Sequence, residues 1–503
     1  MDALEGDAFE VLRLVRSIKN SFAPISRIPP EVLSLIPDYY CDRDGGGDEG
    51  DGDGMDRDLV ALTHVCHGWR DTFASRSSLW TRLSFTNVDK TRTYIQRSQS
   101  APLKLYLEDH TVIDDAFELV IPHLGRLKSL AINTEVFPSV LKHFRCHAPL
   151  LEYLDIYTSR PAGPILDRAL FNGDLLSLRE LHLYGVITDF PWKNFANLRV
   201  VDIRSSSHGY GTAGLLDFLE SAPLLHTITL DFRPLDSPDV PPERIVPLRH
   251  LKFFFIQTRS PLVLLYHLHI PAGASLKSRF HFDSDEPPLR DYLPERSPNF
   301  SNLSHITTIN LTFNRKKEYA RFSGPSGSLH LLPTSGSRYV SLSVPLLRFF
   351  DPPILSTIQR LTVSGYANPG TECAVSQTLS SANHLRILIL IDCDDQLFTR
   401  ALDPGQNPSN PVLCPGMEEV ILYLRHCSLH GSYFKSLVTM AKNRASRGVS
   451  LPSITIVSRD GLPPERWVSG LRKYVTHVVC KIDERRPPAW DHVPGEGGGS
   501  GWV

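Results

Sequence analysis

Leu127-Lys128-Ser129-Leu130-Ala131-Ile132 and Leu151-Glu152-Tyr153-Leu154-Asp155-Ile156 follow one template, with aliphatic residues at the first, fourth and sixth positions. The template returns along the chain at Leu178, Leu198, Leu225, Leu248, Ile306, Ile358, Leu385 and Met417. The first intervals are 24, 27, 20, 27 and 23 residues, and the next two are 58 and 52. Repeats of 20–29 residues are typical of stacked strand-and-helix units.

Alternate side chains of a strand face opposite ways, so the fourth and sixth positions face the interior together. A single repeat cannot bury this face alone, so neighbours must stack. The pattern therefore predicts an α/β fold, a curved parallel sheet lined by outer helices, with helical stretches at 140–147, 214–221 and 433–444. We expect a last strand at 454–457 and long loops at 233–247, 283–299 and 323–338. Each of the two wide intervals contains either a degenerate repeat, with candidates near 261–270 and 341–350, or a long insertion.

These leucines resemble an irregular leucine-rich repeat solenoid. That family usually places Asn or Cys at template position 9, where it satisfies backbone groups at the turn. In this chain only Cys393 fits, so we expect uneven curvature and irregular turns.

A second pattern lies upstream: Ile28-Pro29-Pro30-Glu31-Val32-Leu33, then Val65-Cys66-His67-Gly68-Trp69 and Leu79-Trp80. It resembles the F-box, a small helical module that docks onto a Skp-type adaptor of a cullin ubiquitin ligase, and it is similar to the large F-box families of mushroom-type fungi. A unit this small cannot bury all its apolar residues, so we expect some of them to be covered by a partner protein. The resemblance implies adaptor contacts at Ile28, Pro29, Val32, Leu33, Ile36, Leu59, Leu62, Val65 and Trp69.

An internal-core role stays open for Leu62, Val65 and Trp69, and Trp80 is expected in the core. The module spans 24–84 and contains an acidic segment at 42–58, with seven Asp, one Glu and six Gly. Such a composition cannot bury enough apolar surface to offset its ordering entropy, so we predict a disordered insertion. No register of the segment fits a calcium-binding loop.

The composition and motifs exclude several classes of function. Lys and Arg total 53 against 55 Asp and Glu, which gives nucleic-acid binding no support. We find no secretory signal, no membrane-length apolar run and no CxxC pair among eight cysteines, which favours the cytoplasm or nucleus. No nucleophile or phosphate-binding motif occurs, and the clusters at His64 and His426 lack further ligands. We expect no enzyme activity, cofactor or metal.

Outward positions on the predicted strands offer a surface for a protein target. They are Tyr153, Asp155, Tyr157, His182, Tyr184, Asp202 and Arg204. Aromatic and Arg side chains are common in binding hot spots, although an ordinary solvated sheet face is the alternative. Ile387, Ile389 and Ile391 form an apolar outward row that is either covered or used for binding.

The predicted organisation is an amphipathic helix in 1–23 that packs on the next domain, the module at 24–84, repeats at 100–485 and a flexible tail at 486–503. The resemblance implies a substrate-recognition subunit of an SCF-type (Skp-cullin-F-box) ligase in ubiquitin-dependent protein degradation. Its partners would be the Skp-type adaptor, the cullin core and an unknown protein target. The alternative is a repeat scaffold for protein–protein interaction without a ligase.

Overall fold

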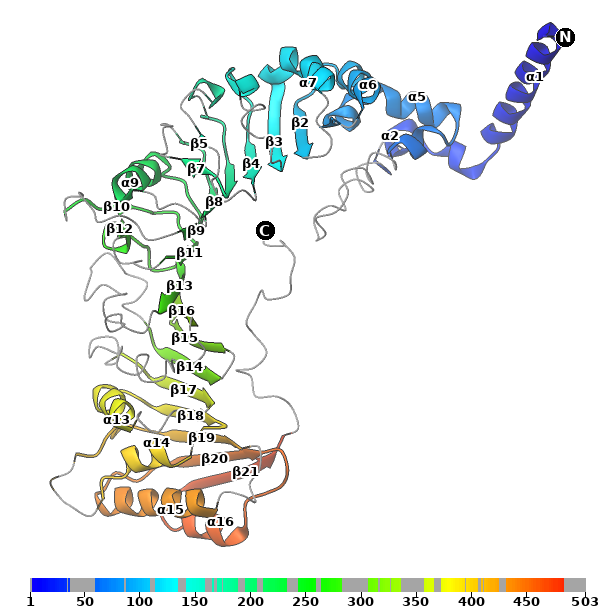
Figure 1. Cartoon of the computed structure of the whole chain (residues 1–503). Helices are drawn as coiled ribbons and strands as arrows, with labels where there is room; N and C mark the ends of the chain where they lie inside the picture. The colour runs from blue at the N-terminus through cyan, green and yellow to red at the C-terminus, as the bar shows by residue number, and fades with distance from the viewer. Residues whose placement is uncertain are drawn as a thin grey trace. The chain divides into compact units, whose positions relative to one another are not determined.

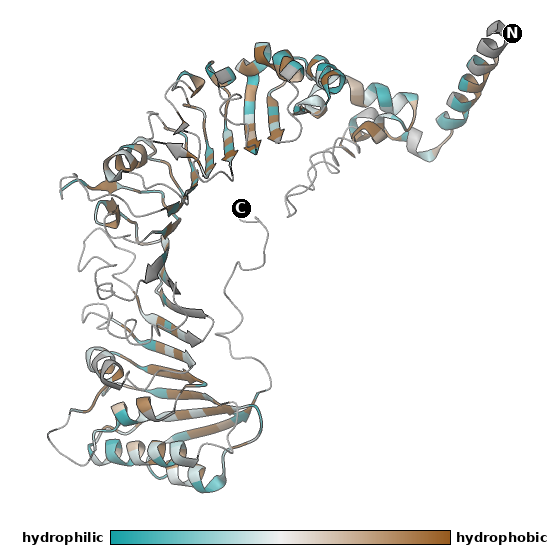
Figure 2. Ribbon diagram, viewed as in Figure 1, coloured by the Kyte–Doolittle hydropathy of each residue, from teal (hydrophilic) through white to brown (hydrophobic). Residues whose placement is uncertain are grey.

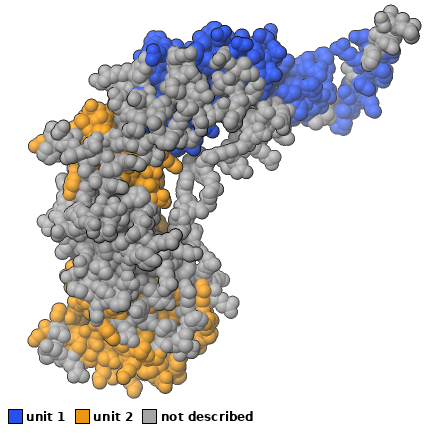
Figure 3. All heavy atoms as spheres, in the orientation of Figure 1, with its two compact units in different colours: residues 1–198, 495–503 blue, residues 199–494 orange. Residues whose placement is uncertain are grey.

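A computed structural model describes residues 2–33, 35–36, 59–85, 87–108, 114–133, 142–158, 165–166, 170–173, 175–188, 195–205, 211–232, 243–258, 264–282, 306–314, 317–325, 327–335, 357–365, 372–393, 395–405, 409, 411–424 and 431–483. The chain divides into two compact units (Figure 3). Unit 1 comprises 1–198 with 495–503, and unit 2 comprises 199–494. The predicted insertion at 42–58 and the tail at 486–503 lie outside the described residues.

The start of unit 1 is helical. Its elements are α1 (Asp2–Ser21), η1 (Pro24–Arg27), α2 (Pro30–Leu33), a helical stretch at 59–63, α5 (His67–Ser75) and η3 (Ser77–Trp80). A proline suits the first turn of α2, because that turn has no use for its missing N–H. Leu33, Trp69 and Phe73 form a small buried core. The side chains of Ile28, Ile36, Leu62, Cys66 and Leu79 pack against it.

Trp80 joins this helical core to the sheet that follows. Its side chain is buried, as predicted, and its indole Nε1 donates a 2.9 Å hydrogen bond to the Phe73 carbonyl oxygen. The ring meets Tyr94 of α6 (Val88–Ser98) edge to face, with centroids 5.0 Å apart. The Arg97 guanidinium carbon lies 4.3 Å from the centroid of the same ring.

Seventeen strands in the described part of the chain belong to one mostly parallel sheet (Figure 1). In unit 1, neighbouring strands pair in parallel and in chain order. They are β1 (Arg82–Ser84), β2 (Leu103–Glu108), β3 (Leu127–Asn133), β4 (Tyr153–Tyr157) and β6 (Glu180–Tyr184). The connections include α7 (Asp114–Val120), η4 (Ile121–Arg126), η5 (Lys142–Phe144), η6 (Leu170–Gly173) and the small pair β5 (Ile165–Leu166) and β7 (Ile187–Thr188).

Unit 2 carries the remaining strands. They are β8 (Val200–Ser205), β9 (Thr227–Phe232), β11 (Phe253–Gln257), β13 (Ser275–Phe282), β14 (Thr308–Asn314), β15 (Lys317–Ser323), β16 (Ser328–Ser335), β17 (Arg360–Gly365), β18 (Ile387–Ile391), β19 (Glu419–Leu424), β20 (Ser453–Ser458) and β21 (His477–Ile482). A separate pair joins β10 (Val246–Pro247) to β12 (Leu268–His269). The helices are α9 (Thr212–Ser221), α13 (Glu372–Ser381), α14 (Asp395–Leu402), α15 (Gly431–Ser446) and α16 (Glu465–Leu471).

The strand register explains why the template selects aliphatic residues. Leu130, Leu154 and Leu181 lie opposite one another on three successive strands, and all three are fully buried. The same alignment recurs in unit 2, where Leu361, Leu388 and Val420 are paired and buried. Brown, apolar residues are concentrated along strands β18–β21 in Figure 2. Each strand therefore covers the apolar side chains of its neighbours.

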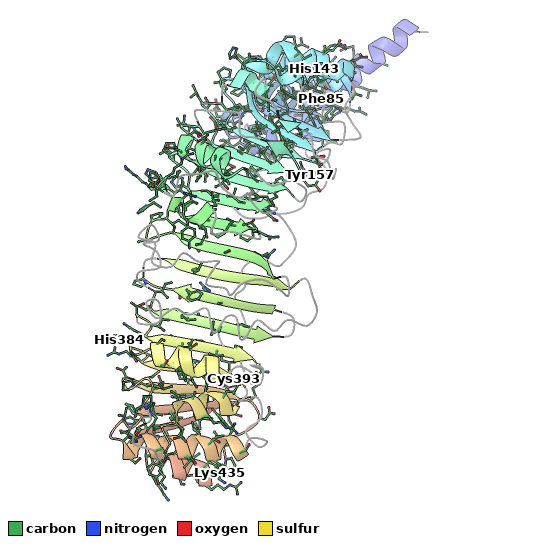
Figure 4. All side chains as sticks on the ribbon, turned by 60° about the vertical axis from the view of Figure 1, so that its left-hand side comes forward. Phe85, His143, Tyr157, His384, Cys393 and Lys435 are labelled. Carbon is green, nitrogen blue, oxygen red and sulfur yellow. The ribbon has the colours of Figure 1, made fainter. Side chains whose placement is uncertain are left out.

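Several expectations about individual elements are confirmed. Helices α9 and α15 match the stretches predicted at 214–221 and 433–444, and β20 matches the strand at 454–457. The buried Cys393 thiol, labelled in Figure 4, lies 3.1 Å from the Val363 carbonyl oxygen, as its template position predicts. The described part of 140–147 holds only the short turn η5, and β21 adds a strand after the expected last one.

The sixth repeat was placed three residues too early. Thr227, Ile228 and Leu230 of β9 pair with Phe253, Phe254 and Ile256, so the template begins at Leu251 rather than Leu248. Phe254 and Ile256 are fully buried, whereas Phe253 is half-buried. Leu248 and Leu251 are both buried and stand three residues apart. Because three consecutive phenylalanines begin at Phe253, a template that starts at either leucine finds apolar residues at its later positions.

The predicted loop at 323–338 is wrong. It contains β16, which pairs in parallel with β13 and antiparallel with β15, and β15 runs antiparallel to β14. The strand that follows β11 in the sheet is β13, which lies downstream of the predicted region at 261–270. The template does not recognise β13, because its sixth position is the buried Ser278 instead of an aliphatic residue. The candidate at 341–350 lies outside the described residues.

The Trp80 indole bond predicts unequal effects of two matching substitutions. Trp80→Phe removes a bond worth about 1 kcal/mol, whereas the Trp69 Nε1 has no acceptor in the described part of the structure. Both changes delete the same ring atoms. Amide hydrogen exchange in α5 should therefore be about fivefold faster in Trp80→Phe than in Trp69→Phe. Equal rates, or faster exchange in Trp69→Phe, would contradict this role for the bond.

Candidate functional site

The helical module leaves apolar side chains on its surface. Pro29 is exposed, and the side chains of Val32 and Val65 are each 50% exposed. Sequence reasoning missed two more, Leu35 at 50% and Val60 at 41%. Val32 and Leu35 stand three residues apart, and the Leu35 N–H donates to the Val32 carbonyl oxygen at 3.1 Å, so both lie on one side of this turn.

The other predicted adaptor residues lie further inside the module. Leu33, Leu59 and Trp69 are buried, with exposed fractions of 6%, 4% and 7%. Ile28, Ile36 and Leu62 are half-buried against the core. The Arg70 Nε donates to the Thr63 carbonyl oxygen at 3.1 Å and ties the helical stretch at 59–63 to α5. The nine predicted residues thus divide into a supporting interior and three exposed residues, Pro29, Val32 and Val65. With Leu35 and Val60 added, these are the exposed apolar residues that we call the module surface: Pro29, Val32, Leu35, Val60 and Val65.

Five of the seven predicted target residues come together in unit 1. Register places Asp155 opposite His182 and Tyr157 opposite Tyr184 on β4 and β6. The ring centroids of Tyr153 and His182 are 5.4 Å apart, and those of His182 and Tyr184 are 6.5 Å apart and stacked. Tyr157, labelled in Figure 4, is 46% exposed at the end of β4. We call this group the aromatic cluster: Tyr153, Asp155, Tyr157, His182 and Tyr184.

The ionisable side chains of the aromatic cluster form hydrogen bonds with neighbours on the same strand. The Tyr153 hydroxyl donates to Asp155 Oδ2 at 3.2 Å, and burial followed by this carboxylate raises the pKa of Tyr153. A hydrogen bond with His182 lowers the pKa of Glu180 on the same strand. The cluster therefore presents rings and a neutral phenol, and these are chemical features that suit protein recognition.

The remaining two predicted residues, Asp202 and Arg204, belong to unit 2. Arg204 donates to both Asp202 carboxylate oxygens, Nε to Oδ1 at 2.9 Å and Nη2 to Oδ2 at 2.7 Å. Asp202 is 8% exposed. A two-pronged pair of this kind holds both side chains in a fixed position.

A row of basic side chains in unit 2 was missed by sequence reasoning. Lys277, His330 and Arg321 lie at one register position on β13, β16 and β15. The neighbouring Phe255 ring has the Lys277 ammonium 5.5 Å and the Arg279 guanidinium carbon 5.9 Å from its centroid. Burial, then the charges of Arg321 and Lys277, lower the pKa of His330 to about 4. No signal in the repeat pattern could find this row, because β15 and β16 depart from the template.

The apolar outward row of unit 2 is partly covered. Ile391 is 1% exposed, whereas Ile387 and Ile389 are half-buried. Ile389 is aligned with Ile421 on β19, and the same register position reaches Val479 on β21, which is 37% exposed.

No group of three or more His, Cys, Asp or Glu side chains that could hold a metal occurs among the described residues. Within the same residues, no helix combines the length and the apolar content needed to cross a bilayer. No family model matches the chain, and no curated protein matches it either.

The low pKa of His330 predicts a specific pH dependence. The unfolded chain binds a proton on this imidazole near pH 6.5, and the folded chain does so only near pH 4. The free energy of unfolding should therefore fall as pH drops through this window, and His330→Asn should remove part of that fall. Urea unfolding midpoints at pH 7 and pH 4.5 test this, with His384→Asn at an exposed position (Figure 4) as the matched control. An unchanged pH response in His330→Asn would contradict it.

Proposed function

We propose that this chain is the substrate-recognition subunit of an SCF-type ubiquitin ligase. The observation that carries the proposal is the module surface, because Pro29, Val32 and Val65 belong to segments that resemble the F-box and Leu35 and Val60 lie within five residues of those segments. An apolar surface on so small a helical unit is a common mark of a protein-binding site. The Skp-type adaptor is the partner that the resemblance implies.

The roles of the module residues then differ. Val32, Leu35 and Val65 would contact the adaptor directly, because each is 50% exposed. Leu33 and Trp69 would act as positioning residues that hold the turn of α2 against α5 through the shared core. The edge-to-face contact of Trp69 with Phe73, with centroids 5.5 Å apart, supports that internal role.

The remainder of the chain would hold the target. The aromatic cluster of unit 1 offers Tyr157, Tyr184 and His182 as adjacent rings on a sheet face. Such rings supply large contact area at little cost in side-chain entropy. We assign the repeat-like strands to a leucine-rich repeat solenoid that keeps a bound protein near a ubiquitin-charged enzyme. The mechanism is raised effective concentration, with no chemical step on this chain.

Co-purification of the full chain with a purified Skp-type adaptor tests the proposal. Val32→Asp and Val65→Asp each place a charge on the module surface and should weaken capture by about 10- to 100-fold. Leu462→Asp is the matched control, because Leu462 is 57% exposed in unit 2 and should tolerate the same charge without loss of capture. Circular dichroism of each variant checks that the fold survives.

Two other outcomes have definite meanings. Capture only after deletion of 42–58 would make the acidic segment a block on the adaptor site while keeping the receptor assignment. No capture by the native chain or by the deletion variant would overturn the ligase assignment and leave a protein-interaction scaffold as the better account.

A further inference from the structure

Helix α1 exposes large apolar side chains over residues 11–18. We expected this helix to pack on the following domain, and that expectation is wrong for the side chains described. Val11, Val15 and Ile18 are 63%, 56% and 53% exposed, and Phe22 just after the helix is 73% exposed. Most of the stability of a helix in a protein comes from packing of its apolar face, so α1, a helix of 20 residues, would be stabilised by a partner surface.

The apolar residues of α1 follow a seven-residue repeat. Leu4, Ala8, Val11, Val15, Ile18 and Phe22 alternate in steps of four and three residues. This spacing is that of the seam of a two-helix coiled coil, and it would place Ala8, Val15 and Phe22 at a positions and Leu4, Val11 and Ile18 at d positions. Leu12 and Leu14, at 53% and 63% exposed, flank the middle of the seam and widen its apolar surface.

The charges of α1 are divided between its two halves. Asp2, Glu5, Asp7 and Glu10 occupy the first half. Arg13, Arg16 and Lys19 occupy the second half. Two such helices side by side in parallel would bring like charges together, whereas antiparallel helices would set each acidic half against a basic half.

We propose that α1 pairs with α1 of a second copy of this chain in an antiparallel coiled coil. The heptad positions support this orientation, because every a residue then meets a d residue. Ala8 lies across from Ile18 of the second copy, Val15 from its Val11 and Phe22 from its Leu4. Glu5 and Lys19 both occupy e positions, which are neighbours across an antiparallel seam, so two opposite-charge pairs flank the core.

The proposed pairing is separate from adaptor binding. It uses residues before the module surface, and its readout is molecular mass rather than capture of an adaptor. The fungal F-box resemblance is not needed for it, since the helix exposure, the heptad spacing and the charge division carry it alone.

The first experiment measures the mass of the full chain by sedimentation over a range of concentrations. The native chain of 56.4 kDa should approach twice that mass as concentration rises. Val15→Asp places a charge in the seam and should abolish the dimer. Asn20→Asp adds the same charge at an outward f position of the heptad and should leave the dimer intact. A native monomer at all concentrations, or a dimer that survives Val15→Asp, would overturn the proposal.

Charge exchange tests the orientation. Glu5→Lys and Lys19→Glu should each weaken the dimer about threefold to tenfold by turning attraction into repulsion, and the double variant should restore it. In a parallel pair the two positions stand 14 residues apart, about 21 Å along the axis, and cannot compensate each other. No restoration in the double variant would contradict the antiparallel arrangement.

A native monomer whose α1 binds anionic vesicles, or whose adaptor capture fails in Val15→Asp, would give the helix another partner and overturn the proposal.

Discussion

The alignment of aliphatic side chains across neighbouring parallel strands is the constraint on which the rest of the structure depends. A single strand exposes its apolar face on its own, and only the paired strands on either side cover it. The alignment of Leu130 with Leu154 and Leu181 illustrates the rule in unit 1, and Leu361 with Leu388 and Val420 illustrates it in unit 2. Because each strand fixes the register of the next one, the outward-facing residues of neighbouring strands are also aligned in rows. The aromatic cluster and the row of Lys277, His330 and Arg321 both arise in this way.

The helical module obeys a different constraint. It has one small core around Leu33, Trp69 and Phe73, which is too small to cover every apolar side chain of the segment. Trp80 fixes this core to the start of the sheet through its bond to Phe73 and its contact with Tyr94. The module surface is therefore presented on a supported element, which suits recognition by a partner.

The sequence predicted the fold wherever three aliphatic positions recur at a regular interval, since burial on a strand then admits one register. It failed where that information is ambiguous. Leu248 and Leu251 fit the same template, and Ser278 hides a strand because a buried polar residue takes an aliphatic position. The antiparallel strand β15 could not be predicted from the repeat pattern, because a repeat of parallel strands contains no signal for a reversal of strand direction.

The candidate site was predictable to a similar degree. The segments of the module followed from the motif, but the pattern could not separate the buried Leu33 from the exposed Val32 beside it, because a helix of four residues has too few turns to define a face. The aromatic cluster followed from strand alternation, whereas the basic row required the true strand order. The packing of α1 was mispredicted because an apolar stripe looks the same whether its partner lies in the same chain or in another molecule.

Hydrogen exchange of the full chain with and without the purified Skp-type adaptor tests the central claim most directly. The account predicts slower exchange in 30–35 and 59–66 when the adaptor binds, and no change in strands β17–β21 of unit 2. Adaptor binding without protection of those two segments, or protection confined to the sheet, would contradict the assignment of the module surface as the docking site.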